Sequence, residues 1–356
     1  MRSRFMQICL LLSLSIFSFA QETVDTIYGS CVVTEPVLCA LINSDAFNRL
    51  KGINQYGIVH YIHEGKVPYT RHTHSLGVFF LLRHYGASLK EQVAGLLHDV
   101  SHTVFSHVGD HLKNSAHAVI DQTREAYQDE EHLWLLAQTD IASILAEHGL
   151  SLESINHKGG DFAMLEDELP NICADRLEYN LYGAFVEGWL EQEEISEILD
   201  ALHYEDETWF FDDPVQAKKL ADASIRLCTD IFASSYNAGS YSMTAQALMR
   251  AVDIKLISYQ DILFGTDDAM LAQLLSSDDT MIASYMEKAL RAKSIYVASD
   301  AQSSDLSYIG KFRGINPWIR VDDCLVRLTE CDAEFNARYQ AARAYVCARH
   351  YYRCVV

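Results

Sequence analysis

The stretch VAGLLHDVSHTVFSHVGDHL, residues 93–112, places a His98–Asp99 pair in an apolar, helix-forming context. The pair joins a nitrogen ligand of borderline softness to a hard oxygen ligand, and divalent metals bind such combinations. In a helix, residues four apart share a face, so we expect His98 and His102 to point the same way with Asp99 one step round. Eleven of the fifteen histidines lie within residues 60–132. The stretch therefore predicts a metal site on a helix.

A protein shell around a divalent ion needs two further ligands from elsewhere in the chain. His74, in an Arg-x-x-His sequence 24 residues before His98, is one candidate. Asp175, in NICADRLEYN (171–180), is the other. Because Asp175 adjoins Arg176, spacing alone also allows a simple surface ion pair there.

Composition indicates a globular protein with a sizeable core, since 49% of the 356 residues are hydrophobic and only five are prolines. Apolar residues recur at helical spacing over residues 35–301, whereas residues 306–356 alternate between strand-like and helix-like composition. We therefore predict an all-α body over residues 21–305 and a small α+β extension, a β-α-β appendage, over residues 306–356. No internal repeat stands out.

The N-terminus has the pattern of a secretory signal peptide over residues 1–20. Two arginines precede an apolar run over residues 6–19, which is shorter than the about 20 residues of a spanning helix. Cleavage after Ala20 would give a secreted or periplasmic protein without a membrane span; an uncleaved anchor or a mistaken start is the alternative. The mature charge would be 26 minus 49, or −23, because the removed segment holds two of the 28 basic residues and no acid. Such a chain would repel nucleic acid polymers and anionic membranes.

Cysteine usage leaves the redox state open. Eight of nine cysteines remain after residue 20, an even number that permits disulfides in an oxidising compartment. Cys324, Cys331, Cys347 and Cys354 crowd the C-terminus and are the best candidates for pairing, with buried free thiols as the alternative. There is no C-x-x-C motif, which argues against a thiolate zinc site.

Three ordered motifs carry a family resemblance: RHTHSLGV (71–78), GLLHDVSHTVFSH (95–107) and CADRLEY (173–179). Together they resemble the HD superfamily of metal-dependent phosphohydrolases, and most of all its deoxynucleoside triphosphate triphosphohydrolase branch. DTIYG (25–29) and FNRLKGINQYG (47–57) match as well, so the resemblance covers about residues 25–185.

The resemblance implies an HD-type helical bundle with one divalent metal ion, whether Mn, Fe, Ni, Zn or Mg. It also implies a role for each matching residue. The metal ligands would be His74, His98, Asp99 and Asp175. The groups beside the metal would be His102, His107, Asp110 and His132. The substrate contacts would be Arg71 on the phosphate, Gln55 on the sugar and Tyr179 on the nucleoside.

The chemistry follows from these residue types. A divalent ion with open positions lowers the pKa of water and polarises a phosphoryl oxygen. Imidazoles at 102, 107 and 132 would titrate near neutrality and move protons, with Asp110 orienting one of them. Arg71 would hold the developing negative charge.

Beyond Tyr179 the chain departs from the triphosphohydrolases. Gly183 stands where they have an aspartate that binds the 3′-hydroxyl. They also have a basic helix that binds the phosphates, but the matching residues 228–249 contain no Lys, Arg or His. Arg176 remains as a candidate phosphate contact. Four polar residues of the same region could line a pocket for a less charged ester or could serve helix packing: Tyr236, Asn237, Tyr241 and Ser242.

The leading hypothesis is a metal-dependent phosphohydrolase acting on a small phosphorylated substrate such as a nucleotide. A metal-retaining HD protein without catalysis is the second hypothesis, and a cyclic nucleotide or alarmone hydrolase is the third. The resemblance also suggests self-association into a homo-oligomer.

Overall fold

The computed structural model of the protein describes residues 21–63, 67–109, 119–121, 131–159 and 161–355. Its α-helices are α1 (Pro36–Ile42), α2 (Asp45–Arg49), α3 (Arg71–His84), α4 (Leu89–Leu97), α7 (His132–Ala137), α8 (Ile141–Glu147), α9 (Ala174–Val186), α10 (Gln192–Asp200), α11 (Pro214–Arg226), α12 (Ser235–Asp253), α13 (Tyr259–Phe264), α14 (Asp267–Leu275), α15 (Thr280–Leu290), α16 (Ala292–Ile295), α17 (Leu328–Cys331) and α18 (Ala333–Cys347). Short 3₁₀ turns are η1 (Leu50–Gly52), η2 (Gly57–Ile62), η3 (Glu153–Ile155) and η4 (His157–Gly159), and η5 (Leu227–Phe232) is a π-helical turn. The strands are β1 (Glu22–Thr26), β2 (Gly29–Val33), β3 (Val119–Asp121), β4 (Leu202–Glu205), β5 (Thr208–Phe211), β6 (Tyr296–Ala298), β7 (Leu306–Ile309), β8 (Trp318–Val321), β9 (Cys324–Arg327) and β10 (Arg349–Cys354).

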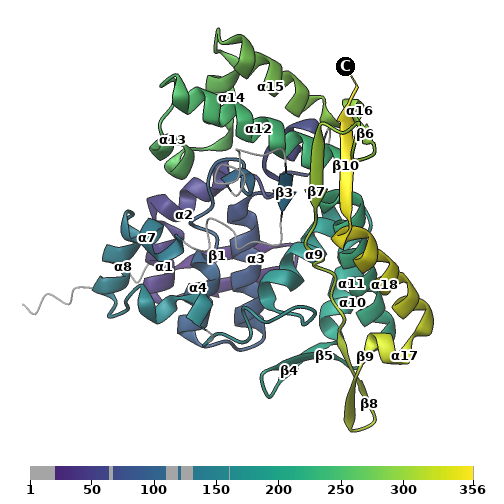
Figure 1. The fold of residues 1–356 in the computed structure, drawn as a ribbon. Helices are drawn as coiled ribbons and strands as arrows, with labels where there is room; N and C mark the ends of the chain where they lie inside the picture. Colours follow the sequence, from purple (N-terminus) through teal and green to yellow (C-terminus); the bar gives the residue numbers. More distant parts are fainter. Residues whose placement is uncertain (1–20, 64–66, 110–118, 122–130, 160, 356) are drawn as a thin grey trace, which may run out of the picture.

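The prediction of an all-α fold is wrong, because the described residues form three sheets. One is the β1–β2 hairpin, and the other two have four strands each, in the orders β3-β7-β10-β6 and β4-β5-β8-β9. Both larger sheets join strands from distant parts of the chain: β3 pairs in parallel with β7, and β5 pairs in parallel with β8. The fold is a helical core combined with these sheets, a mixed α and β architecture (Figure 1).

The C-terminal strands are not a self-contained appendage. The expected boundary near residue 305 falls between β6 and β7, and β10 pairs antiparallel with both. The predicted β-α-β pattern is present only in outline, because the first strand region folds into the β8–β9 hairpin and α18 continues to Cys347 before β10 begins. In Figure 1, β7 and β10 run alongside β3, so the end of the chain meets the segment that follows the His98–Asp99 motif.

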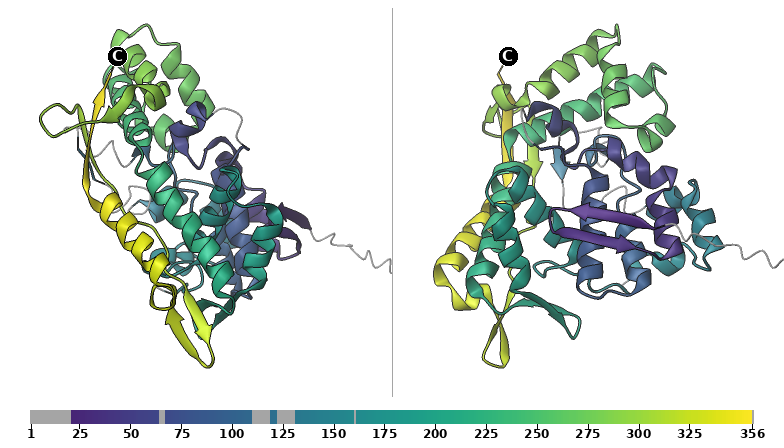
Figure 2. Two further views of the ribbon diagram at one scale, coloured as in Figure 1. Left: turned by 90° about the vertical axis from the view of Figure 1, so that its right-hand side faces the viewer. Right: turned by 180° about the vertical axis from the view of Figure 1, so that it is seen from behind.

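The N-terminal hairpin covers the outside of the helical body. Seen from behind in Figure 2, β1 and β2 lie across the helices, and β1 packs on α3. Their register pairs Glu22 with Val33 and Thr26 with Gly29. Val24 and Val33 are almost fully buried, so the hairpin belongs to the main core.

Helix starts near the site carry the caps that their sequences predict. The Thr70 side chain accepts a hydrogen bond from the Thr73 amide at the start of α3, and Ser88 does the same for Glu91 at the start of α4. The inner faces of both helices, including Val78, pack into one large core. These two helices therefore form a rigid wall for the metal motif.

Three further findings bear on the sequence predictions. The expected signal peptide, residues 1–20, lies outside the described residues. None of the described helices is long and apolar enough to cross a bilayer. All eight described cysteines are free, so the expected pairing among the four near the C-terminus is not seen.

Candidate metal centre

Arg71 and His74 belong to the first turn of α3, which begins at Arg71, and both are buried. They lie on the same face of its first turn, and they are 4% and 0% exposed. The neighbours His72 and Thr73 line a separate pocket, and the His72 ring packs on Phe47 of α2 with ring centroids 4.8 Å apart. The local fold thus separates the motif residues from the neighbours between them.

The second helix of the motif is shorter than predicted. α4 ends at Leu97, and His98 is its C-cap, with Nδ1 2.7 Å from the Gly95 carbonyl oxygen. Asp99 and His102 lie in the turns that follow, and the His102 amide donates to the Asp99 carbonyl at 3.0 Å. The expectation that His98 and His102 share a continuous helical face is therefore wrong, although both side chains still reach the same site.

The structure brings the four expected ligands together. His74 Nε2 lies 3.1 Å from His98 Nε2 and 3.0 Å from Asp175 Oδ1. His98 Nε2 lies 3.5 Å from both Asp99 Oδ1 and Asp175 Oδ1. Ligand atoms of His74, His98 and Asp99 all fall within 4.8 Å of one another. His74 from α3, and His98 and Asp99 from the end of α4, thus form one group, and Asp175 from α9 contacts both of its imidazoles.

The electrostatics of the cluster suit a divalent cation. Burial alone would raise the pKa of Asp99, but the charges of Arg71, His98 and His102 hold it well below its usual range. Asp175 is kept ionised in the same way, because hydrogen bonds and charge from His74 and His98 outweigh burial. Two ionised carboxylates beside two imidazole nitrogens are a donor set for ions such as Mn²⁺, Fe²⁺ or Zn²⁺. The residues present therefore fit the single divalent ion that the motifs imply.

Arg71 is fixed by three partners around the cluster. Its Nη1 donates to Asp99 Oδ2 at 2.8 Å and its Nε to Ser106 Oγ at 3.1 Å. Its Nη2 lies 3.3 Å from His107 Nε2. The guanidinium thus sits directly beside a metal ligand, where a phosphate bound to the ion would meet it.

His102 and His107 also lie next to the cluster. His102 Nε2 is 3.2 Å from Asp99 Oδ1, and the two imidazole rings are 5.1 Å apart. Burial and the charge of Arg71 lower the pKa of His102 to about 3, so it does not titrate near neutrality as we expected. Its Nδ1 is buried without a hydrogen-bond partner among the described residues. Asp110, expected to orient one of these histidines, lies outside the described residues.

His132 begins α7 and reaches the same region. Its Nδ1 lies 2.8 Å from Ser101 Oγ, while its Nε2 is buried without a partner in the described part of the chain. Burial and then the charge of His98 lower its pKa to about 3. His157 packs between His132 and His98, with ring centroids 4.7 and 6.3 Å away. Sequence reasoning missed His157, because it comes from a loop turn with no local pattern.

Glu178 is the second residue that sequence reasoning missed. Its carboxylate is fully buried and forms a short contact with His74 Nδ1. It also accepts hydrogen bonds from Tyr69 Oη at 2.6 Å and Tyr28 Oη at 3.2 Å. Burial alone would lower the pKa of His74, but Glu178 and the nearby aspartates raise it to about 10. A carboxylate on Nδ1 leaves His74 Nε2 facing His98 and Asp175, where it could hold a metal ion. The signal was present in CADRLEY, since Glu178 lies three residues after Asp175 and so on nearly the same side of α9.

Two of the four expected substrate contacts have unused polar atoms. Gln55 Oε1 and Tyr179 Oη are buried without hydrogen-bond partners among the described residues. Arg176 differs, because its Nη1 donates to the Asn171 carbonyl at 2.7 Å and its Nη2 to the Asp167 carbonyl. The guanidinium of Arg176 is therefore hydrogen-bonded to the loop before α9, and both of its Nη atoms already have partners.

The region of Gly183 is closed by neighbouring side chains. A Cβ at this position would lie 3.1 Å from Leu227 Cδ1 and 3.4 Å from Tyr56 Oη. In α12, Tyr241 Oη donates to the Tyr56 carbonyl at 3.1 Å. Asn237 and Tyr236 likewise donate to backbone carbonyls. These α12 side chains serve packing, which was one of the two alternatives left open.

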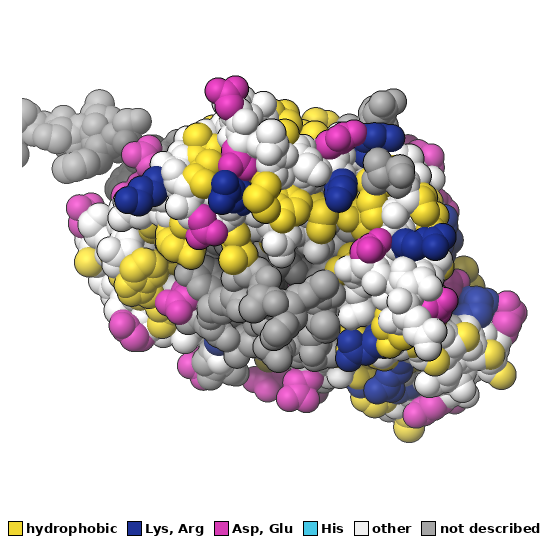
Figure 3. All heavy atoms as spheres, turned by 45° about the horizontal axis from the view of Figure 1, so that its top comes forward, with side chains coloured by type: hydrophobic (Ala, Val, Ile, Leu, Met, Phe, Trp, Pro, Cys, Tyr) yellow, Lys and Arg dark blue, Asp and Glu magenta, His cyan; other side chains and the backbone are white. Residues whose placement is uncertain are grey.

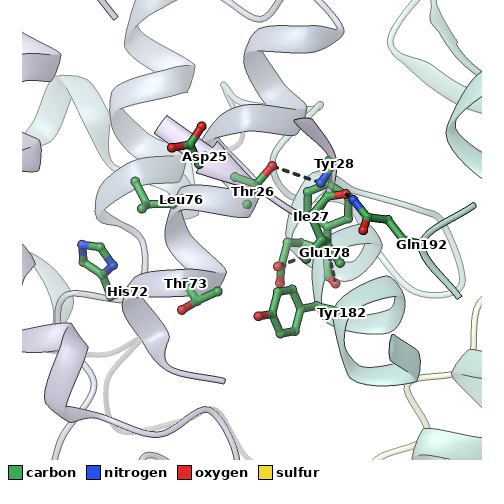
Figure 4. A pocket seen from close by; sticks show the side chains of 11 residues that line it. Asp25, Thr26, Ile27, Tyr28, His72, Thr73, Leu76, Glu178, Tyr182 and Gln192 are labelled. Atoms are coloured by element: carbon green, nitrogen blue, oxygen red, sulfur yellow. Dashed lines mark hydrogen bonds between the residues drawn. The ribbon is translucent and has the colours of Figure 1, made fainter. Parts of the chain in front are cut away.

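A pocket of about 530 Å³ lies behind the cluster, on the far side of α3 (Figure 4). Side chains of the β1–β2 hairpin, α3 and α9 line it, among them Asp25, Thr73 and Tyr182. Glu178 contributes to its wall and also contacts His74, so this residue links the pocket to the metal cluster.

Comparisons with known proteins agree with this geometry. The HD domain family matches residues 71–179, the span from Arg71 to Tyr179. The uncharacterized protein YdhJ of Bacillus subtilis is 32% identical over 302 residues, which cover 85% of this chain and 89% of YdhJ. The metal-dependent phosphohydrolase cns2 of Cordyceps militaris is 39% identical over 179 residues, 50% of this chain and 49% of cns2.

More distant matches point the same way. The deoxynucleoside triphosphate triphosphohydrolase SAMHD1 of Gallus gallus is 27% identical over 161 residues, 41% of this chain and 25% of that protein. The crystal structure of a phosphohydrolase from Bacteroides thetaiotaomicron superposes with a TM-score of 0.67 at 15% identity, covering 95% of this chain and 100% of the other. That structural likeness concerns the fold alone. Because the HD domain match spans the assembled cluster and the similarity to YdhJ extends over most of both chains, this chain belongs to the HD superfamily of metal-dependent phosphohydrolases.

Proposed function

We propose that this protein hydrolyses a phosphoester of a nucleotide or similar small molecule with the help of one divalent metal ion. The observation that carries the proposal is the position of Asp99, whose carboxylate belongs to the ligand cluster and also contacts Arg71 and His102. A cation that could bind phosphate, Arg71, and an imidazole that could form a hydrogen bond with substrate or water, His102, thus both contact this one candidate ligand.

Each group has a part in the reaction. A divalent ion, when bound, supplies Lewis acidity that polarises a phosphoryl oxygen and lowers the pKa of water. Arg71, buried and held by Asp99 and Ser106, binds the phosphate and stabilises the charge that develops on it. His102 is neutral at pH 7 because of its low pKa, so its unpartnered Nδ1 is available to form a hydrogen bond with substrate or water.

The residues expected to contact the substrate support a nucleotide, but the aspartate that would bind the sugar 3′-hydroxyl is missing. SAMHD1 is named for deoxynucleoside triphosphates, and the motifs shared with that branch include Gln55 and Tyr179, whose polar atoms have no internal partners among the described residues. The aspartate that would bind a 3′-hydroxyl is replaced by Gly183, and Tyr56 and Leu227 close that position. We propose that sugar recognition here depends on hydrogen bonds from Gln55 and Tyr179.

An anionic substrate is compatible with the overall charge of −21. On the face in Figure 3, Lys and Arg side chains are interspersed with Asp and Glu, so the negative charge is not uniform there. A bound divalent cation would also make the electrostatic potential at the site more positive.

The test is a substrate panel of dNTPs, NTPs, nucleoside monophosphates and cyclic nucleotides, each with Mg²⁺, Mn²⁺, Fe²⁺ and Zn²⁺. We expect phosphate or triphosphate release only with metal. Asp99→Ala should abolish turnover, whereas Asp278→Asn, an exposed position, should keep it. A tightly held metal without turnover of any substrate would overturn the proposal and favour a non-catalytic metal-binding protein.

Two predictions from the sequence remain to be tested alongside. We propose that the protein acts outside the cytoplasm, which intact-mass measurement of the purified native protein would check through a new terminus at Gln21. Self-association is the other, and light scattering would measure it.

A further inference from the structure

The side chain of Arg49, the last residue of α2, binds three backbone carbonyl oxygens. Its Nη2 donates to the Val100 carbonyl at 2.8 Å and to the His102 carbonyl at 2.7 Å. Its Nη1 donates to the Gly265 carbonyl at 3.1 Å. One guanidinium thus joins the turns that follow α4 to the corner between α13 and α14.

The carbonyls of Val100 and His102 belong to the segment that carries the metal motif. Because α4 ends at Leu97, the carbonyl oxygens that follow it cannot all be bonded within a helix. Both residues are buried, and a buried carbonyl without a donor is unfavourable. Among the described residues, Arg49 is the only donor to either carbonyl oxygen. The path of the backbone from Asp99 to His102 therefore depends on this guanidinium.

This stretch of backbone sets the positions of two side chains of the site. Asp99 belongs to the ligand group and directly precedes Val100, and its Oδ1 lies 3.2 Å from His102 Nε2. The His102 amide also donates to the Asp99 carbonyl at 3.0 Å, so the two residues move together. A displacement of about 1 Å at a reaction centre is enough to lose most of its activity.

The corner between α13 and α14 is a firm support for the other end of the guanidinium. A Cβ at Gly265 would lie 2.3 Å from the Asp261 carbonyl oxygen and 3.4 Å from Val104 Cγ1, so the turn is too tight for a side chain. The Val104 amide also donates to the Ile262 carbonyl at 3.0 Å, which ties the same two parts of the chain together. Burial lowers the pKa of Arg49 only to about 10, so the guanidinium is charged at pH 7.

We propose that Arg49 is a positioning residue for the metal site, because it holds the backbone of Asp99 and His102 in place against the corner between α13 and α14. The inference rests on the proposed function, since it names a residue that supports the same metal site. Arginine suits this role, because its planar fork reaches carbonyls on two elements at once and charged donors form the stronger hydrogen bonds. The later helices would then contribute to the geometry of a site whose four ligands lie within residues 74–175.

The test measures Mn²⁺ binding to the metal-free full chain by calorimetry, well below the melting temperature of every variant. We expect Arg49→Gln to weaken Mn²⁺ binding about 10-fold or more, as the loss of support for a ligand typically does. Arg49→Lys should lie between Arg49→Gln and the wild type, because an ammonium can replace Nη2 at two carbonyls but cannot also reach Gly265.

The control is Arg250→Gln, which removes an arginine whose ion pair with Asp279, at 2.8 Å, joins α12 to the start of α15. It should lower the melting temperature without changing the Mn²⁺ affinity, so it separates a loss of stability from a loss of positioning. Equal losses of Mn²⁺ affinity in Arg250→Gln and Arg49→Gln would overturn the inference. Wild-type affinity in a folded Arg49→Gln would overturn it as well, while leaving the proposed function in place.

Arg49→Lys decides the matter if Arg49→Gln does not fold. Weaker Mn²⁺ binding in a folded Arg49→Lys supports the inference, and wild-type affinity overturns it. Turnover gives a second readout, because for any nucleotide that the wild type hydrolyses, Arg49→Gln with saturating Mn²⁺ should lower kcat about 10-fold and leave KM nearly unchanged. Mn²⁺ binding that depends on Arg49, without hydrolysis of any substrate, would support this inference and overturn the proposed function alone.

Discussion

The carboxylate of Asp267 accepts a hydrogen bond from the Phe105 amide at 2.6 Å, across 162 residues of sequence. Its second oxygen accepts from the amide and the side chain of Asn54 at 2.8 and 3.0 Å. Phe105 and Ser106 have φ values of 55° and 53°, in the left-handed region that costs non-glycine residues about 1–3 kcal/mol each. Ser106 in turn holds Arg71 through its hydroxyl. A buried acid on α14 thus stabilises the strained turn that positions the phosphate-binding arginine.

Asp267→Asn should therefore impair both folding and turnover. An amide can accept through one oxygen only, and its NH₂ group would face a backbone N–H donor. We expect the free energy of unfolding to fall by about 1–3 kcal/mol and kcat to fall about tenfold or more as Arg71 loses its position. Denaturant unfolding and steady-state kinetics measure the two effects. Asp278→Asn, at an exposed position, should change neither, and an Asp267→Asn enzyme with wild-type kcat would contradict the positioning role.

Glu178→Gln should weaken metal binding. The variant keeps the size of the side chain but removes the carboxylate that contacts His74 Nδ1, so the imidazole becomes a poorer and less well oriented ligand. Loss of such a partner typically reduces metal affinity about 10- to 100-fold. Metal content after dialysis against a graded chelator series measures the change. Glu193→Gln, exposed on α10, is the matched control; equal metal retention in both variants would show that Glu178 is structural only.

The local parts of the site could be predicted from the sequence. The helical spacing of apolar residues over residues 35–301 predicts helices such as α3 and α9, and the motif order led us to expect His74 and Asp175 close to His98, where the structure places them. The end of α4 could not be predicted, because no Gly or Pro follows Leu97 to mark it. The helix stops where His98 and Asp99 turn toward the cluster, which is a tertiary effect.

Contacts between distant residues were beyond the sequence pattern. β3 pairs with β7 and β5 with β8, and parallel pairing between such distant strands has no local signature, which is why the fold was taken for all-α. The same reason hid His157 and Asp267, which meet the site only through the tertiary fold. Expected proton-transfer groups were found near the metal position, but their pKa values depend on burial, and this moved His102 and His132 far from neutrality.

Acid should destabilise the protein partly through His157. Burial, followed by the charges of His132 and His98, lowers its pKa from 6.5 to about 2 in the folded state. Below pH 6.5 the unfolded chain then binds a proton that the folded chain does not, so this contribution to stability is complete above pH 6.5 and is lost as pH falls. The loss is about 1.4 kcal/mol per pH unit.

The corresponding experiment measures the free energy of unfolding between pH 7 and pH 5. His157→Gln should show a shallower decrease than the wild type, by up to about 1.4 kcal/mol per pH unit. His148→Gln, at an exposed position, should keep the wild-type slope. Parallel pH profiles for all three proteins would rule out the contribution of His157.

Arg71→Lys should be almost as harmful as Arg71→Ala. The three nitrogens of Arg71 each have a different partner, and a lysine ammonium cannot reach Asp99, Ser106 and His107 together. We expect kcat to fall about 100-fold in either variant, with metal content retained. Arg83→Lys, on the same helix but outside the site, is the control. Near-normal turnover in Arg71→Lys would mean that charge alone is needed at this position.

Discrimination at the sugar 3′-position should be weak in this protein. In the triphosphohydrolases that the chain resembles, an aspartate at the position of Gly183 binds the 3′-hydroxyl, and here no side chain takes that place; an added Cβ would lie 3.1 Å from Leu227 Cδ1. A 2′,3′-dideoxynucleotide should therefore be hydrolysed with kcat/KM similar to that of the 2′-deoxynucleotide. Gly183→Asp should not restore the preference, because its side chain would press on Leu227 and lower the free energy of unfolding by about 1–3 kcal/mol. Gly183→Ala serves as the control for the added Cβ alone. A strong wild-type preference for the 3′-hydroxyl would instead show that another side chain, such as Tyr56, binds it.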